Sequence, residues 1–145
     1  ERIKSRAKLG FAVKDIIDNL PGAFIVYRAD KENDEILLAN SELLRLTGCK
    51  NMDELLAYTG KSFCNLIRPD EQESCQKSIW SQINGGHSNN YIFFHMRKAD
   101  GTYISVLDHG RIVDSVYNGR VFYVIIMDLK SLQRHFGDCL KLVEK

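Results

Sequence analysis

The chain has 145 residues, of which 44% are hydrophobic and 27% charged, and its formal net charge is +1. These values are typical of one globular domain and exclude a chain that is mainly disordered, collagenous or of low complexity. The small net charge also argues against nucleic acid as a partner, because binding to phosphates depends on an excess of Lys and Arg.

The cysteines and the longest apolar run predict a cytoplasmic protein. No Cys-x-x-Cys pair occurs and no His has zinc-site spacing, so we expect reduced thiols and no metal site at positions 49, 64, 75 and 139. The longest apolar run, Val121–Met127, is far shorter than the ~20 residues that span a bilayer. We expect no membrane contact by this segment, although a full-length protein could be anchored in a membrane elsewhere. Because the chain starts without Met and ends inside a helical pattern, we interpret it as part of a longer protein.

The first twenty residues predict a helix that flanks the domain. Its apolar side chains recur at steps of three and four, which places them on one helix face: Leu9, Val13, Ile16, Ile17 and Leu20. Pro21 and Gly22 end this pattern. We therefore expect a flanking dimerisation helix over 1–20, a domain over 21–128 and a C-terminal linker helix over 129–145.

Two short strands and small helices come next. The strands are expected at Ala23–Tyr27 and Ile36–Ala39, joined by a polar loop. Asn40 or Ser41 caps a first small helix, which Gly48 ends in a left-handed conformation.

Asn51, with Glu54 three residues later, resembles a capping box for a second small helix that ends at Gly60. Pro69 and Asp70 open a longer helix with one buried face, on which the apolar residues recur every four positions: Cys75, Ile79 and Ile83.

The second half of the chain predicts an antiparallel meander. Three strand-like runs, Tyr91–Arg97, Tyr103–Val113 and Val121–Met127, are separated by Asp100-Gly101 and Asn118-Gly119. These dipeptides are favoured in type I′ hairpin turns, where both central residues need positive φ. The expected fold class is α+β, with a five-stranded antiparallel sheet, small helices on one face and flanking N- and C-terminal helices.

The last strand does not alternate between apolar and polar residues. Such a strand is expected to be covered on both faces. The small helices cover one face, and the flanking helices, or those of a partner, are expected to cover the other.

The C-terminal segment carries an apolar stripe with the spacing of a coiled-coil seam: Leu129, Leu132, Phe136, Cys139 and Val143. A helix that docks on its own domain gives the same stripe, so both readings stay open.

In this order of elements, the chain resembles a PAS domain, a sensor module of bacterial signalling proteins. The resemblance runs from about Ile16 to Leu129 and is closest to PAS domains that precede diguanylate cyclase or histidine kinase outputs. It rests on four stretches, Asn19–Phe24, Ile36–Gly48, Ile67–Glu71 and Arg97–Gly110.

The resemblance implies a cytoplasmic sensor that is itself no enzyme, dimerises and passes a signal through its flanking helices to an output domain. It implies a dimer and linker surface made by Leu9, Val13, Ile16, Ile17, Leu20, Leu129, Leu132 and Phe136. The family often ends its last strand with Asp-x-Thr, a hinge between the domain core and the C-terminal linker. This chain has Asp128-Leu129-Lys130, so the hydrogen bonds of this hinge must differ.

Cofactor signals of the family are missing, so no cofactor is assigned. Cys64 lies in the region of the flavin-binding cysteine but lacks its sequence context, and a small buried thiol is the simpler reading. The long helix has no His for haem, and His87 follows it in a polar loop.

His95 and His109 stand on adjacent predicted strands and share the sheet face away from the helices. Two His on one face suggest a metal pair, but no third ligand is apparent, so a polar pair under a flanking helix is the alternative. Asp108 lies on the helix-facing side, where a carboxylate needs a partner or a raised pKa. It either binds a polar ligand group or pairs with Arg111, Arg120 or Tyr27.

Alternation along the strands predicts which side chains face the helices and line a ligand pocket or fill a packed core: Ile25, Tyr27, Ile79, Ile83, Phe94, Met96, Val106, Asp108, Phe122, Val124 and Ile126. Their bulk favours a small cavity or none.

Two functions follow. The first is a sensory module for a small ligand or partner, and the alternative is a purely structural dimerisation domain without a ligand. An enzyme is disfavoured because Ser105 and His109 point opposite to Asp108 and no catalytic motif occurs.

Overall fold

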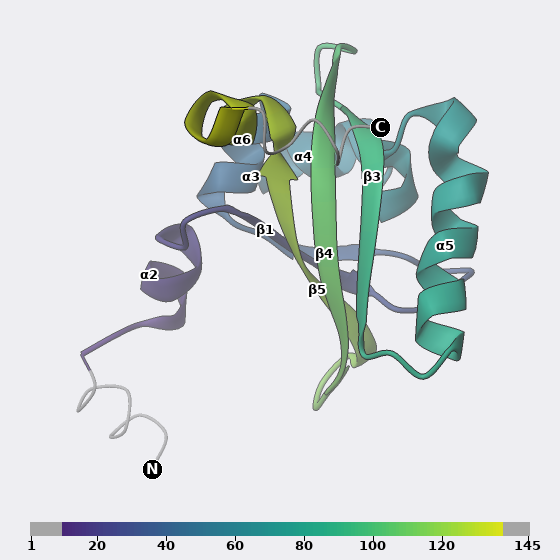
Figure 1. The fold of residues 1–145 in the computed structure, drawn as a ribbon. Helices are drawn as coiled ribbons and strands as arrows, with labels where there is room; N and C mark the ends of the chain where they lie inside the picture. The colour runs from purple at the N-terminus through teal and green to yellow at the C-terminus, as the bar shows by residue number, and fades with distance from the viewer. Residues whose placement is uncertain (1–9, 138–145) are drawn as a thin grey trace.

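The computed structural model describes residues 10–137, which fold around one antiparallel sheet (Figure 1). The five strands lie in the order β2-β1-β5-β4-β3, so the first and last strands of the sheet region are neighbours at its centre. This confirms the expected α+β class and the meander of the last three strands. The strands are β1 (Ala23–Arg28), β2 (Ile36–Ala39), β3 (Asn89–Arg97), β4 (Tyr103–Ser115) and β5 (Gly119–Asp128).

The helices between β2 and β3 bury their apolar sides against one face of the sheet and form the core with it. The long helix α5 runs alongside the edge strand β3 (Figure 1). The helices are α2 (Val13–Asp18), α3 (Ser41–Thr47), α4 (Met52–Thr59), α5 (Gln72–Asn84) and α6 (Leu129–Phe136), with short 3₁₀ turns η1 (Phe63–Leu66) and η2 (Pro69–Glu71).

Local capping determines where the small helices begin and end. The side chains of Asn40 and Asn51 accept hydrogen bonds from the backbone N–H groups three residues later, at the starts of α3 and α4. Gly48 and Gly60 end these helices with φ values of 82° and 60°, which glycine adopts without strain. Both predicted caps are confirmed.

Asn40 also joins the N-terminal segment to the sheet. Its fully buried amide donates to the backbone oxygens of Ile17 (2.8 Å) and Gly22 (3.0 Å). Its Oδ1 accepts from the backbone N–H groups of Phe24 (2.9 Å) and Leu43 (3.0 Å). One side chain therefore connects the end of α2, the start of β1 and the start of α3.

Side chains form hydrogen bonds with the backbone at the outer edge of β3. The Gln82 amide donates to the Tyr91 backbone oxygen (3.0 Å) and accepts from the Tyr91 backbone N–H (2.9 Å). Glu71 Oε1 accepts from the His95 backbone N–H (2.8 Å). These bonds occupy backbone groups that an exposed edge strand would offer to another chain.

The prediction of type I′ turns is wrong. Gly101 and Gly119 have positive φ, 86° and 68°, but Asp100 and Asn118 do not. At the first turn, Lys98 and Thr102 face each other across a three-residue loop (2.8 Å between the Lys98 N and Thr102 O atoms), and only its last residue needs the left-handed region.

The N-terminal helix is shorter than the sequence pattern predicts. Among the described residues it spans only Val13–Asp18, and Gly10, with φ of 77°, lies outside it. Val13 and Ile16 are 58% and 50% exposed, Ile17 and Leu20 are half-buried, and Leu9 lies outside the described residues.

The C-terminal helix α6 ends at Phe136, before Gly137, so the predicted stripe does not continue as one helix through this point. Leu129 is buried, Leu132 half-buried and Phe136 exposed, whereas Cys139 and Val143 lie outside the described residues. Asp128 caps α6 by accepting from the Lys130 backbone N–H (3.0 Å) and the Ser131 hydroxyl (3.3 Å). The chain has no Thr two residues after Asp128, and the Ser131 hydroxyl supplies a hydrogen bond to the Asp128 carboxylate instead.

Within residues 10–137 the flanking helices do not cover the second face of β5, and the alternative that helices of a partner cover it stays a prediction. On this face Tyr123 is 47% exposed, and Ile125 and Met127 are only half-buried. α2 lies away from the sheet, and α6 reaches only the ends of β4 and β5 (Figure 1). No helix in residues 10–137 is long and apolar enough to cross a membrane.

Candidate functional site

The structure places the predicted pocket residues in the core. Ile83 is half-buried at its margin, and the other ten are almost fully buried: Ile25, Tyr27, Ile79, Phe94, Met96, Val106, Asp108, Phe122, Val124 and Ile126. Aromatic rings fill much of this space, since Tyr27 stacks on Phe63 with ring centroids 4.0 Å apart.

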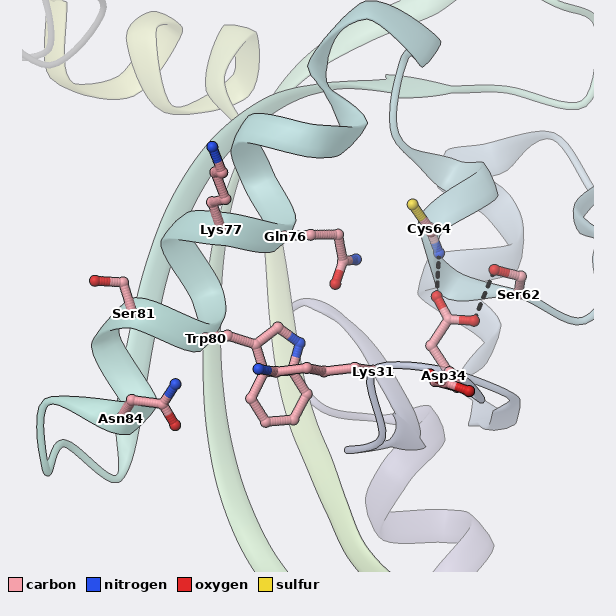
Figure 2. Close-up of a pocket in the computed structure, with 10 residues that line it drawn as sticks. Lys31, Asp34, Ser62, Cys64, Gln76, Lys77, Trp80, Ser81 and Asn84 are labelled. Atoms are coloured by element: carbon pink, nitrogen blue, oxygen red, sulfur yellow. Dashed lines mark hydrogen bonds between the residues drawn. The ribbon is translucent and has the colours of Figure 1, made fainter.

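A cleft of about 640 Å³ lies beside this core (Figure 2). None of the predicted pocket residues lines it. It lies between α5, the loop that joins β1 to β2, and η1. Its lining residues are Lys31, Glu32, Asp34, Ser62, Cys64, Gln76, Lys77, Trp80, Ser81 and Asn84.

The cleft combines an aromatic ring with fixed polar groups. The Lys31 ammonium lies 5.5 Å from the Trp80 ring centroid, a cation–π contact (Figure 2). The Asp34 carboxylate accepts from the Ser62 hydroxyl (2.7 Å) and the Cys64 backbone N–H (2.8 Å). Such a site offers a ring surface and several hydrogen-bonding groups to a small molecule.

Lys31 and Trp80 also line a second hollow of about 650 Å³, which extends past Arg28 and Arg120 towards the turn between β4 and β5. Arg28 is paired with Glu35 (2.9 Å). The two hollows share the Lys31–Trp80 contact as a common wall.

Trp80 connects the cleft to the central strand. Its ring meets Phe122 of β5 edge to face, with centroids 5.7 Å apart. Phe122 in turn contacts Tyr27 of β1 at 5.2 Å. Because β5 continues directly into α6 through Asp128, an occupant of the cleft touches a side chain that packs on the strand leading to the C-terminal helix.

Among residues 10–137, two buried side chains each have one polar atom without a hydrogen-bond partner. The Oδ2 atom of Asp108 and the Nδ2 atom of Asn90 make no hydrogen bond, although both residues are only 1% exposed. A buried polar group without a partner costs about 1–3 kcal/mol. Burial raises the pKa of Asp108 well above 3.8, because desolvation disfavours the charged form.

The predicted structural pairing of Asp108 is wrong for the described residues. Arg111 points to the opposite face by alternation, Arg120 stands opposite Asp114, and no hydrogen bond joins Asp108 to Tyr27. Burial, followed by the charges of Asp108, Asp34 and Cys64, raises the pKa of Tyr27.

The two histidines are not a pair. β4 places Ser105 opposite His95 and His109 opposite Tyr91, so the two rings lie four positions apart along the sheet. His95 Nδ1 lies 2.9 Å from Glu71, and His109 stacks on Tyr91 at 4.3 Å. Within residues 10–137 no group of three His, Cys, Asp or Glu side chains is placed to hold a metal ion.

Cys64 and His87 have ordinary surroundings. Cys64 is half-buried in the cleft wall, where burial and then the charge of Asp34 raise its pKa and keep the thiol protonated. His87 is exposed in the loop after α5.

The sequence interpretation missed the cleft residues. One row of cleft residues could have been predicted, because four-residue steps place its members on one side of α5, next to the predicted buried row: Gln76, Trp80 and Asn84. Lys31 and Asp34 gave no such signal, because they come from an irregular loop.

Comparisons with known proteins agree with this fold. Residues 36–127 match the family model described as the PAS fold. No curated protein sequence matches the chain.

Solved structures at low sequence identity share this fold. A PAS domain of an HTR-like protein from Haloarcula marismortui has 20% identity and a TM-score of 0.65, over 88% of this chain and 97% of that one. A PAS domain from a two-component sensor histidine kinase has 17% identity and a TM-score of 0.62, over 86% and 98%. A LuxR-family regulator from Burkholderia thailandensis, whose PAS domain is in complex with ethanol, has 22% identity and a TM-score of 0.62, over 83% and 99%.

Proposed function

Because the chain belongs to the PAS family, whose domains are sensory modules of signalling proteins, we propose that it senses a small molecule in the cleft beside Trp80. The signal passes through the flanking helices to an output domain in the full-length protein. The module itself is non-catalytic and cytoplasmic, and its output domain is a histidine kinase or a diguanylate cyclase.

The contact between Trp80 and Phe122 carries this proposal. A ligand that displaces Lys31 from the Trp80 ring changes the packing of Trp80 on β5. α6 begins where β5 ends, and Ala23, at the start of β1, pairs with Ile126 near the end of β5. The start of β1 and the end of β5 are therefore adjacent. Both flanking segments can respond to the same change in the packing of Trp80 on β5. The ethanol complex of the LuxR-family relative supports a small guest in this fold.

Fluorescence of Trp80 tests the proposal directly, because it is the single Trp of the chain. A metabolite library is screened for a saturable change in Trp80 emission and an increase in Tm. Trp80→Phe should keep the increase in Tm but lose the emission signal, whereas Trp80→Ala should weaken binding. Tyr117→Ala changes an exposed aromatic residue in the turn between β4 and β5 and is the matched control. If no molecule changes either the emission or Tm, the sensor proposal is wrong.

The second candidate is a structural dimerisation module. It is favoured by the exposed aromatic side chains on the open face of the sheet, Tyr91, Phe93 and Tyr123, and by Val13 and Ile16 on α2. Analytical ultracentrifugation of the wild type, Ile16→Asp and Tyr123→Lys separates the possibilities. A dimer that both changes weaken, in a chain that binds no library molecule, favours this candidate, whereas a monomer excludes it.

A further inference from the structure

The second hollow, of about 650 Å³, gathers cationic side chains from three segments of the chain. Arg28 comes from the end of β1, Lys31 from the β1–β2 loop and Arg120 from the start of β5. Among the described residues that line this hollow, Asp30 is the one acid. Three positive charges therefore stand against one negative charge in its walls.

The two hollows differ in charge although they share a wall. In the Trp80 cleft, two lysines, Lys31 and Lys77, stand against two acids, Glu32 and Asp34, so the charges of its walls balance (Figure 2). The second hollow has the excess of positive charge. A ligand with an anionic group is therefore expected to place that group in the second hollow, because opposite charges attract most strongly where the walls carry a net charge.

Hydrogen bonds fix the guanidinium of Arg28 at the edge of the second hollow. Its Nε donates to Glu35 (2.9 Å), and its Nη1 donates to the backbone oxygen of Asn118 in the turn between β4 and β5 (3.2 Å). These bonds use two of its five N–H donors. Glu35 offsets part of the charge of Arg28, but the fixed guanidinium still presents its remaining donors in one direction, as binding of phosphate or carboxylate oxygens requires.

Lys31 and Arg120 form no ion pair with any residue in 10–137. Asp114 stands opposite Arg120 on β4 without forming a salt bridge to it, and Asp30 instead accepts from the Glu32 backbone N–H (2.9 Å). Both cationic side chains are exposed. A single exposed ion pair contributes little, so affinity here requires one anion that contacts several of the cations together.

We propose that the second hollow binds the phosphate group of a small organic phosphate, with the rest of the molecule against the Trp80 ring. A phosphate monoester carries a charge of about −1.5 to −2 at pH 7 and three acceptor oxygens, which suits three cations with one acid. Asn84 and Asn118 line the same hollow and add amide donors. A neutral or cationic molecule leaves the positive charges of Lys31 and Arg120 without a partner.

This inference rests on the proposed function in one respect, since it names the class of ligand that moves Lys31 away from Trp80. The Lys31 ammonium lies 5.5 Å from the Trp80 ring centroid and forms the wall between the two hollows. A phosphate beside Arg28 and Arg120 attracts this ammonium. The binding of the anion and the change around Trp80 are then one event.

The test uses the side-chain Nε–H signals of Arg28 and Arg120 in ¹⁵N–¹H correlation spectra, assigned by their loss in Arg28→Gln and Arg120→Gln. Phenyl phosphate is the probe, and benzoate, benzyl alcohol and benzylammonium carry a similar ring with a different charge. KCl keeps the ionic strength equal in all titrations, because salt screens exposed charges. We expect phenyl phosphate to shift both signals saturably, benzoate to bind more weakly, and the other two probes to leave the signals in place.

Arg120→Gln should weaken the binding of phenyl phosphate at least about tenfold, which corresponds to about 1.4 kcal/mol. Lys31→Gln, in an exposed loop, should also weaken it. Both changes are at exposed positions, so both variants should fold, and their Tm values check this. Arg111→Gln removes the same charge from an exposed position of β4 that lines neither hollow, and it is the matched control. A loss in Arg120→Gln no greater than in Arg111→Gln, or equal binding of phenyl phosphate and benzyl alcohol, overturns the inference.

The outcomes separate this inference from the proposed function. If a library molecule changes Trp80 emission equally in wild type and Arg120→Gln, and phenyl phosphate leaves the Arg120 signal in place, the sensor proposal stands and the phosphate site is wrong. If phenyl phosphate shifts the Arg28 and Arg120 signals while neither it nor any library molecule changes Trp80 emission, the phosphate site stands and the Trp80 cleft is not a sensor site.

Discussion

Replacement of Asp108 by Asn should remove a pH dependence from the stability of the chain. Burial raises the pKa of Asp108 in the folded chain well above the ordinary value of 3.8 that applies when the chain is unfolded. The folded chain therefore holds this proton more tightly than the unfolded chain. The stabilisation is fully present below pH 3.8 and is lost as the pH rises towards the folded pKa.

The size of this effect follows from proton linkage. Between the two pKa values, the free energy of unfolding falls by about 1.4 kcal/mol per pH unit because of this one group. Asn does not titrate, so the difference in unfolding free energy between wild type and Asp108→Asn should fall with pH at that rate. Above the folded pKa the difference becomes constant.

Urea unfolding followed by Trp80 fluorescence, at half-unit steps from about pH 4 to about pH 7, measures this difference. Asp114→Asn makes the same chemical change at an exposed position of β4 and controls for the loss of one carboxyl. Parallel pH profiles for wild type and Asp108→Asn would show that the pKa of Asp108 is not raised in the folded chain, and the reasoning about its neutral state would be refuted.

Three further substitutions test the packing described above. Asn40→Ala removes four hydrogen bonds from a fully buried amide, so we expect a loss of about 3–5 kcal/mol in urea unfolding, against a small loss for the exposed Asn84→Ala. Gln82→Ala uncovers the edge of β3, which should cost about 1–2 kcal/mol and speed hydrogen exchange at the Tyr91 amide; unchanged exchange there contradicts the edge role. Gly110→Ala places a Cβ atom 3.1 Å from the Asn90 amide, and we expect a loss of about 1–3 kcal/mol that Asn90→Ala partly restores in a double mutant.

The small helices and the alternation of the strands could be predicted from the sequence because their causes are local. Asn51 caps α4 through an N–H group three residues away, and Gly60 ends the helix in a conformation that glycine adopts freely. Alternation similarly assigned Phe122 and Val124 to the core, since successive strand residues face opposite sides. The resemblance to the PAS family rested on the order of these elements.

The cleft and the unpaired polar groups depended on the tertiary structure. Lys31 and Trp80 lie 49 positions apart in the sequence, and only the packing of α5 beside the β1–β2 loop brings them together. The same holds for Asp108, because strand pairing and side-chain direction decided that the predicted Arg partners lie elsewhere.

The sequence by itself therefore determined the elements, their caps and the buried side of each strand, all of which depend on residues within a few positions of one another. Only the tertiary structure decided which distant side chains meet, where a hollow remains, and that the second face of β5 is open in residues 10–137. The physical reason is that these properties depend on strand order and on the packing of segments far apart in the chain, which no local pattern encodes.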